Sequence, residues 1–238
     1  MVDFLLENYS LLTHSVEWLA AITGVILYKS YKHTNAKYFI WFLIYLSICD
    51  LIGGYKYYVK DGFLSLLQGT VFERNYWWTT SYWKIGAIVF FAFYYYKVLA
   101  KEKYKLILKY SGYLFLVFSI VYIGFHWRAF FVSFFPVISI IGSVVIFFCV
   151  IFYFIELLQT EEILSFYKDI NFYVTAAIFI WWLIITHVVF YDNYMSLGND
   201  NKYMELRQVL YILSNLLMYL TFTFALIYCK PKRDIDKI

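Results

Sequence analysis

Long apolar runs separated by short polar segments recur along almost the whole chain. A bilayer core about 30 Å thick is crossed by about 20 helical residues. The pattern predicts transmembrane helices at about residues 11–28, 38–58, 77–98, 106–125, 132–157, 171–191 and 207–229. We therefore expect an all-α, polytopic membrane protein in which residues 1–238 form a single seven-transmembrane-helix bundle.

The basic residues between these runs predict the orientation of the bundle. They gather in the first and third connections and after the last run, at Lys29, Lys32, Lys37, Lys97, Lys101, Lys103, Lys105, Lys109, Lys230, Lys232 and Arg233. Because basic residues concentrate in cytoplasmic loops, the N-terminus is expected outside and the C-terminus in the cytoplasm. The acidic fifth connection does not oppose this, since Asp and Glu contribute little to orientation.

Composition supports lipid as the solvent. The chain is 63% hydrophobic and only 15% charged, and its net charge of +4 reflects the basic connections rather than a nucleic-acid partner. No stretch of mixed composition reaches the roughly 50 residues of a soluble catalytic or DNA-binding domain. Cys49, Cys149 and Cys229 fall inside apolar runs without metal-ligand spacing, so no metal or cofactor is expected. The first ten residues lack Lys and Arg, which argues against a cleavable signal peptide.

Two connections have a pattern of their own. Residues 60–76 mix apolar residues with Gly, Glu and Arg, as in a short helix or turn on the outer membrane interface. Residues 156–168 read ELLQTEEILSFYK, with apolar positions at helical spacing. We expect this segment to extend the fifth helix, because no Gly or Pro interrupts it, with docking of a partner as the alternative.

Ionisable residues inside the runs are the candidate site. A charged side chain near the centre of a membrane costs several kcal/mol and usually faces the bundle interior. At 1.5 Å rise per residue, such residues fall in the outer half of the bilayer. With two large rings beside them, they form the predicted ligand-binding or intramembrane polar cluster: Glu17, Asp50, Lys56, Lys84, His187, Trp83 and Trp182.

The expected arrangement is a cup that opens outward. Glu17, Asp50 and Lys84 should face one another, and Gly53 and Gly54 should let a neighbouring helix approach. Purely structural roles remain open for each residue. Lys56 would then reach the headgroups, Glu17 and Lys84 would be a packing pair, His187 would be a satisfied interface histidine, and the tryptophans would be interface anchors. A zinc site around His14 and Glu17 is disfavoured, because no ligand spacing supports it.

Several familiar activities lack their motifs. The last run contains no lysine for a retinal Schiff base, and neither a phosphate-binding loop nor a nucleophile elbow is present. The segments YWKIG and FFAFYYYKVL (between 82 and 99), FIELLQTEEIL (154–164), FIWWLII (179–185) and SNLLMYLTFTFALIYCKPK (214–232) nevertheless form a pattern. It resembles a family of uncharacterised multi-pass inner-membrane proteins of flavobacteria and their relatives. This resemblance implies a bacterial cytoplasmic membrane and no particular activity.

The leading functional hypothesis is a sensory or signalling membrane module. Its outward polar and aromatic cup would receive a signal, and the basic third connection together with residues 156–168 would dock a cytoplasmic protein partner. A small-solute or ion transporter is the first alternative, although the sequence shows neither broken helices nor an inverted repeat. A structural or accessory subunit of a membrane complex is the second alternative. An enzyme is not expected.

Overall fold

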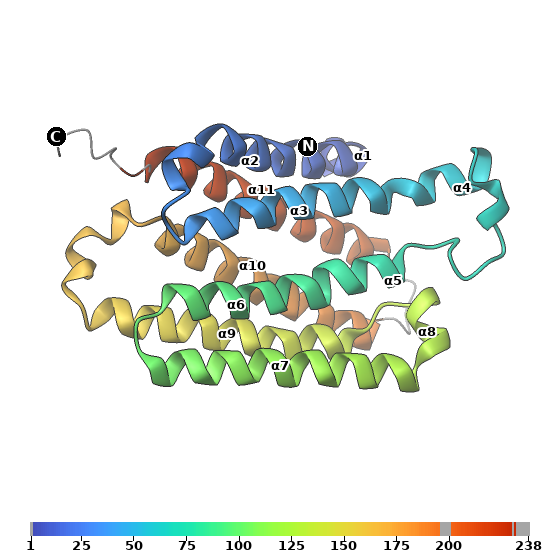
Figure 1. Ribbon diagram of the computed structural model, residues 1–238. Helices are drawn as coiled ribbons and strands as arrows, with labels where there is room; N and C mark the ends of the chain where they lie inside the picture. Colours follow the sequence, from blue (N-terminus) through green and yellow to red (C-terminus); the bar gives the residue numbers. More distant parts are fainter. Residues whose placement is uncertain (1, 196–200, 230, 232–238) are drawn as a thin grey trace.

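Long helices lie side by side along one axis in the computed structural model, which describes residues 2–195, 201–229 and 231 (Figure 1). Every regular element in this part of the chain is helical. The α-helices are α1 (Val2–Glu7), α2 (Tyr9–Tyr31), α3 (Ala36–Gly53), α4 (Tyr57–Asp61), α5 (Tyr76–Thr79), α6 (Ile88–Val98), α7 (Glu102–Phe125), α8 (Trp127–Val132), α9 (Pro136–Leu158), α10 (Ile170–Met195) and α11 (Asn201–Tyr228).

Three of the connections are helical but not α-helical. Residues Gly54–Lys56 and Ser65–Leu67 are 3₁₀ turns, and Thr80–Ala87 form a π-helix that joins α5 to α6. We call Thr80–Ala87 the π segment. A further 3₁₀ segment, Glu161–Lys168, follows α9.

The described part of the chain contains six helical stretches that are long and apolar enough to cross a membrane. They are Tyr9–Tyr31, Ala36–Val59, Glu102–Phe125, Pro136–Leu158, Ile170–Asp192 and Tyr203–Tyr228. Their ends lie within about one helical turn of the expected ones. The expected third span, 77–98, is instead built from α5, the π segment and α6 in succession. The chain is thus a multi-pass membrane protein.

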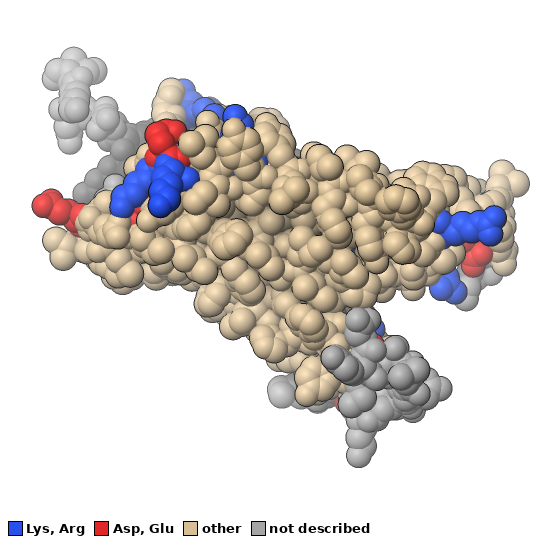
Figure 2. All heavy atoms as spheres, turned by 90° about the horizontal axis from the view of Figure 1, so that it is seen from below, with Lys and Arg blue, Asp and Glu red and all other residues tan. Residues whose placement is uncertain are grey.

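The outer surface of the bundle is apolar, as contact with lipid chains requires. Large apolar side chains such as Ile26, Leu114 and Ile120 are between 62% and 72% exposed along the middle of their helices. Figure 2 shows a long uncharged region on one face, with Lys, Arg, Asp and Glu gathered toward its two ends. Such a surface would be costly in water but is solvated by acyl chains.

Small residues set how closely the helices pack. A Cβ atom on Gly24 of α2 would lie 3.1 Å from Ile40 of α3, and one on Gly112 of α7 would lie 3.0 Å from Ala92 of α6. Close backbone approach of this kind is typical of membrane helices, which lack a hydrophobic driving force for association. In the wider arrangement α2 packs against α3 and α11, α10 against α11 and α9, and α6 against α7 and α9.

The connection after α9 differs from the prediction. Helix α9 ends at Leu158, because the backbone of Thr160 is extended, and Glu161–Lys168 form a separate 3₁₀ segment. The expected extension of the fifth helix is therefore wrong. The sequence contains no Gly or Pro there, and the break rests on backbone hydrogen bonds that residue pattern alone does not reveal.

Glu156, at the end of α9, is buried. Its carboxylate accepts the backbone N–H of Ala100 at 2.7 Å and that of Lys101 at 2.8 Å, at the start of α7. The first N–H groups of a helix have no partner within it, and a carboxylate there also complements the helix dipole. Glu156 thus joins α9 to the connection between α6 and α7.

Some predicted features lie outside the described residues. These are the basic side chains Lys230, Lys232 and Arg233 and the outer position Asn199.

Replacing Glu156 tests the importance of this cap. Glu156→Ala should lower the free energy of unfolding by about 2–4 kcal/mol, because two backbone donors lose a charged acceptor. Chemical denaturation in detergent micelles measures the loss. Glu161→Ala, at an exposed position nearby, is the control and should change the free energy by less than about 0.5 kcal/mol. Equal effects at the two positions would contradict the assigned role.

Candidate functional site

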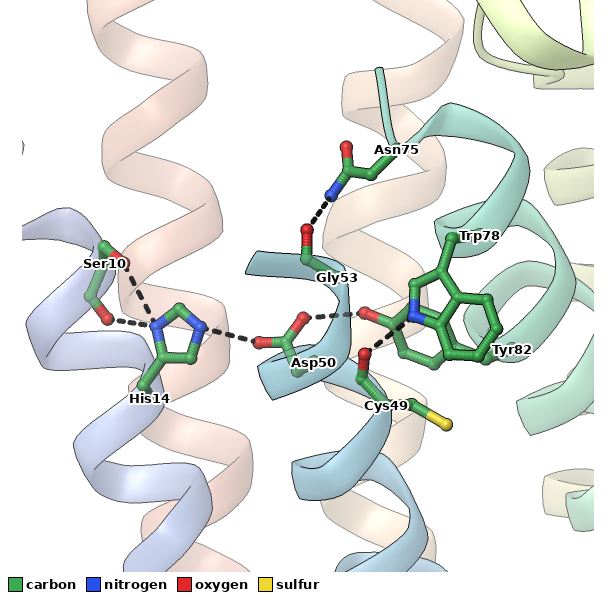
Figure 3. A network of polar contacts seen from close by, with 8 residues as sticks. All are labelled: Ser10, His14, Cys49, Asp50, Gly53, Asn75, Trp78 and Tyr82. Carbon is green, nitrogen blue, oxygen red and sulfur yellow. Dashed lines mark hydrogen bonds and ion pairs between the residues drawn. The ribbon is translucent and has the colours of Figure 1, made fainter. Parts of the chain in front are cut away.

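A polar network joins three helical segments around Asp50 (Figure 3). One carboxylate oxygen of Asp50, on α3, lies 3.1 Å from Nε2 of His14 on α2. The other accepts a hydrogen bond of 2.7 Å from the hydroxyl of Tyr82 on the π segment. Both oxygens of this carboxylate are therefore engaged by side chains from neighbouring helices.

The hydrogen bonds of His14 define where a proton can reside. Its Nδ1 contacts both the backbone carbonyl of Ser10, which can only accept, and the hydroxyl of Ser10 at 3.2 Å, which can also donate, so either tautomer of the ring has a partner there. The contact between Nε2 and Asp50 then has two forms. Either an imidazolium or a neutral imidazole donates to a carboxylate, or a carboxylic acid donates to a neutral imidazole. In both forms one proton lies between His14 and Asp50.

Glu17 places a second carboxyl beside this pair. It lies three residues after His14, on the same face of α2, and is only 3% exposed. Asp50 and the hydroxyl of Ser47 are its neighbours on α3. Two carboxyl groups and an imidazole thus gather between α2 and α3, as the sequence indicated for Glu17 and Asp50.

The backbone departs from regular α-helix on both sides of the network. Helix α3 gives way to a 3₁₀ turn after Gly53, and the facing segment is the π segment. Carbonyls at the end of α3 are bonded by side chains instead: Trp78 Nε1 donates to the carbonyl of Cys49 at 2.7 Å, and Asn75 Nδ2 to that of Gly53 at 2.9 Å. The second and third spans therefore stay continuous, as expected, but their helical winding changes locally.

Gly53 is required where α3 meets Trp78. A Cβ atom on Gly53 would lie 3.2 Å from Cδ1 of Trp78, which is tighter than ordinary packing. A Cβ on Gly54 would meet nothing within 4 Å. Of the two glycines expected to permit close approach, only Gly53 does so.

Lys84 does not join this group, contrary to expectation. Among the residues described, it forms no ion pair with Glu17 or Asp50, and its Nζ lies 4.9 Å from the centre of the Phe134 ring. The reason is its place on the helix. Tyr82 faces Asp50, and a residue two positions further along lies on another face.

The remaining predicted residues are dispersed. Lys56 is exposed and lies over the ring of Tyr57 at 5.0 Å, and His187 is exposed with Nδ1 2.6 Å from the carbonyl of Leu183. Trp83 meets Trp181 edge to face at 5.1 Å, and Trp181 meets Trp182 at the same distance.

These tryptophans pack within the bundle. Trp181 and Trp182 are each 4% exposed, and Trp181 Nε1 donates to Asn215 of α11 at 2.7 Å. This bond joins α10 to α11 and satisfies the Asn215 amide oxygen inside the bundle. The predicted cluster is therefore divided into a His14–Asp50–Glu17 group, a tryptophan group and a separate environment around Lys84.

Two hollows lie away from the network. A pocket of about 490 Å³ at the opposite end of the bundle is lined by residues that include Tyr153, Glu156, Lys168 and Asp169. Tyr153 donates to Asp169 there at 2.7 Å. An open apolar groove of about 510 Å³ runs between α3 and α6 past the stacked rings of Phe42 and Phe90. The groove has the apolar lining that a lipid chain would contact.

Neither the Asp169 pocket nor the role of Tyr82 was predicted from the sequence. Asp169 stands between two apolar runs, which was a usable signal. Tyr82 is one of 26 tyrosines, and nothing in the sequence distinguishes it from the others.

Within the described residues, no set of three His, Cys, Asp or Glu side chains is arranged to hold a metal ion. Comparisons with protein-family models, with curated proteins and with solved structures found no match.

A double-mutant cycle tests the contact between His14 and Asp50. His14→Ala and Asp50→Asn should each destabilise the fold, and the double variant should lose at least about 1 kcal/mol less than the sum, because the two groups share one interaction. Unfolding in detergent provides the free energies. The cycle of Asp50→Asn with Lys56→Met is the control and should be additive. Additivity for His14 and Asp50 would show that they do not interact.

Proposed function

We propose that this chain is a sensory module of a bacterial cytoplasmic membrane, with seven spans, its N-terminus outside and its C-terminus inside. The third span would be the continuous run from α5 through the π segment to α6. The basic residues supply the orientation, since Lys29, Lys97 and Lys103 belong to the end of the bundle where the positive-inside rule predicts cytoplasm.

In this orientation the polar network lies toward the outer side. Asp50 is about 21 Å along α3 from Ala36, at 1.5 Å per residue, in a hydrocarbon core about 30 Å thick. The side chains of His14 and Asp50 are 35% and 31% exposed. The pair is therefore accessible at its outer end, whereas Glu17 is sealed within the bundle.

The observation that carries the proposal is the 3.1 Å contact between His14 and Asp50 at the point where two spans leave regular α-helical geometry. A change of protonation alters the charge on Asp50 and so the strength of its bond to Tyr82. The π segment is held by that bond, and π-helical turns recur at functional sites. Histidine is the side chain whose ordinary pKa range makes such a change accessible near neutral pH.

The titratable neighbours of the pair come from every element around it. They are Tyr9 and Glu17 on α2, Cys49 on α3, Tyr82 on the π segment and Tyr219 on α11. None is a cation, so protonation of His14 is supported by Asp50 and Glu17.

Transmission to the inner end would follow α6. This helix ends at Val98, and the two residues whose N–H groups are bound by Glu156 follow shortly after it. A shift of the π segment would thus reach the inner connection. Exposed apolar side chains nearby, Leu158 and Leu164, offer a docking face for a cytoplasmic protein partner.

A proton-linked transporter is the second candidate, and the irregular spans favour it. Transporters often place helix interruptions beside intramembrane charged groups. The outer network and the polar pocket around Asp169 lie at opposite ends of the bundle, as two ends of a pathway would. Membership in the flavobacterial inner-membrane family remains a prediction for either function.

The topology is tested by labelling single introduced cysteines in intact cells. Positions 32, 103 and 168 should react only with reagents that enter the cytoplasm, and position 70 should react from outside. The native thiols Cys49, Cys149 and Cys229 are buried and should give little background. Labelling of position 103 from outside would reverse the orientation.

The sensing role predicts a pH-linked conformational change. Between about pH 6 and pH 10, a range raised because Asp50 and Glu17 favour the protonated imidazole, hydrogen exchange in the π segment and in residues 99–105 should change in the wild-type protein in nanodiscs, after correction for intrinsic exchange. Asp50→Asn and His14→Gln should abolish the change, while Glu161→Gln should retain it. A wild-type protein without any pH-linked change in these segments would refute the proposal.

Measuring proton flux distinguishes a transporter from a sensor. In proteoliposomes that hold a pH indicator, a sensor should not alter proton leakage. A proton-linked transporter should accelerate it in the presence of its solute, and Asp50→Asn should remove the effect.

A further inference from the structure

Lys84 is an intramembrane cation without a counter-ion among the residues that the structure describes. It lies about 21 Å along the helix from Val98, in the outer half of the proposed bundle, and is partly buried. Its Nζ makes neither a hydrogen bond nor an ion pair with this part of the chain, and its one specific contact is the face of Phe134 at 4.9 Å. A ring face alone is a weak substitute for lost hydration.

In the described part of the chain, the acidic group within electrostatic range of Lys84 already has two other partners. Asp192 of α10 and Arg207 of α11 are within electrostatic range of Lys84. Asp192 Oδ1, however, forms an ion pair with Arg207 Nε at 3.2 Å and accepts a hydrogen bond from the hydroxyl of Tyr203 at 2.7 Å. Within the described residues, the group therefore contains two cations and one anion, with an excess of one positive charge.

The segment that carries Lys84 has another unused donor. Thr80 lies four residues earlier on the π segment and so on a similar face. Its hydroxyl is fully buried and has no hydrogen-bond partner within the described residues. Buried donors are nearly always satisfied, so an unpaired hydroxyl one turn before an unpaired ammonium on the same segment points to a missing acceptor.

We propose that Lys84 binds an anionic group, a carboxylate or a phosphate, in the outer half of the bundle. The group would neutralise the excess charge of Lys84, Asp192 and Arg207, and the rings of Trp83 and Phe134 would adjoin its apolar part. Either the headgroup of an anionic lipid or a soluble anion has this chemistry. The proposal does not depend on the sensing role, because Lys84 is not part of the Asp50 network.

Stability in nanodiscs tests the proposal with two arms. In the first arm, phosphatidylcholine discs are compared with discs that contain phosphatidylglycerol. In the second, inorganic phosphate or acetate is titrated at constant ionic strength into phosphatidylcholine discs. A ligand that binds only the folded protein raises its unfolding temperature, and the fluorescence of Trp83 should change with it. The arm that responds identifies the source of the anion.

Substitutions at Lys84 test whether this residue causes the stabilisation by the anion. Lys84→Met should weaken the apparent affinity at least tenfold, and Lys84→Arg should retain most of it. Lys56→Met is the matched control, because Lys56 is another lysine that lies over a ring, at 5.0 Å, but is exposed. It should behave as the wild type. Lys84→Met should leave the pH-linked change at Asp50 in place, so failure of one proposal is separable from failure of the other.

Two results would overturn the proposal: a wild-type protein that responds in neither arm, or a Lys84→Met variant that responds as the wild type does. Should Lys84→Met not fold, reductive methylation of the wild type gives an independent measurement. The bound anion should protect Lys84 relative to Lys56, as read by mass spectrometry. Equal methylation of Lys84 with and without the anion would also overturn it.

Discussion

Within the hydrocarbon core, a polar group that loses its hydrogen bond finds no water to replace it, and this constraint governs the irregular parts of the bundle. The end of α3 is the clearest case. The α-helix gives way there to a 3₁₀ turn, and the side chains of Trp78 and Asn75 donate to two of its last carbonyls. The turn persists at that depth because these donors come from the facing segment. Gly53 is the residue that lets Trp78 come close enough.

The same constraint acts on charge. Glu156 is buried but accepts two backbone N–H groups, so it stabilises the connection that it touches. Asp50 is bound on both oxygens, by an imidazole and by a phenol. Lys84 has only a ring face. A group whose hydrogen bonds are all formed within the protein, such as Glu156, is structural. An ionisable group that lacks partners, such as Lys84, is stabilised most when a proton or an anion binds to it.

The sequence predicted what depends on hydrophobicity and spacing along one helix. The apolar runs located the helices to within about a turn, and the three-residue spacing of His14 and Glu17 placed both on the face that meets Asp50. The sequence did not predict contacts that depend on how one helix is rotated against another. The π segment turns Tyr82 rather than Lys84 toward Asp50. No Gly or Pro marks where it begins, and TSYWKIGA resembles an ordinary helix in composition. The break at Thr160 was missed for the same reason.

The irregular geometry and the network also depend on each other. Tyr82 reaches Asp50 from within the π segment, and α-helical winding of the same residues would rotate it relative to α3. A bond between Tyr82 and a charged Asp50 is stronger than one to a neutral carboxylic acid. Protonation of Asp50 therefore weakens one restraint on the π winding, while Trp78 and Asn75 still hold the end of α3. The third segment is therefore tied to α3 by two bonds that do not titrate, from Trp78 and Asn75, and by one that does, from Tyr82. A movement linked to a proton would thus begin at Tyr82, which lies on the α6 side of Trp78, and proceed along α6.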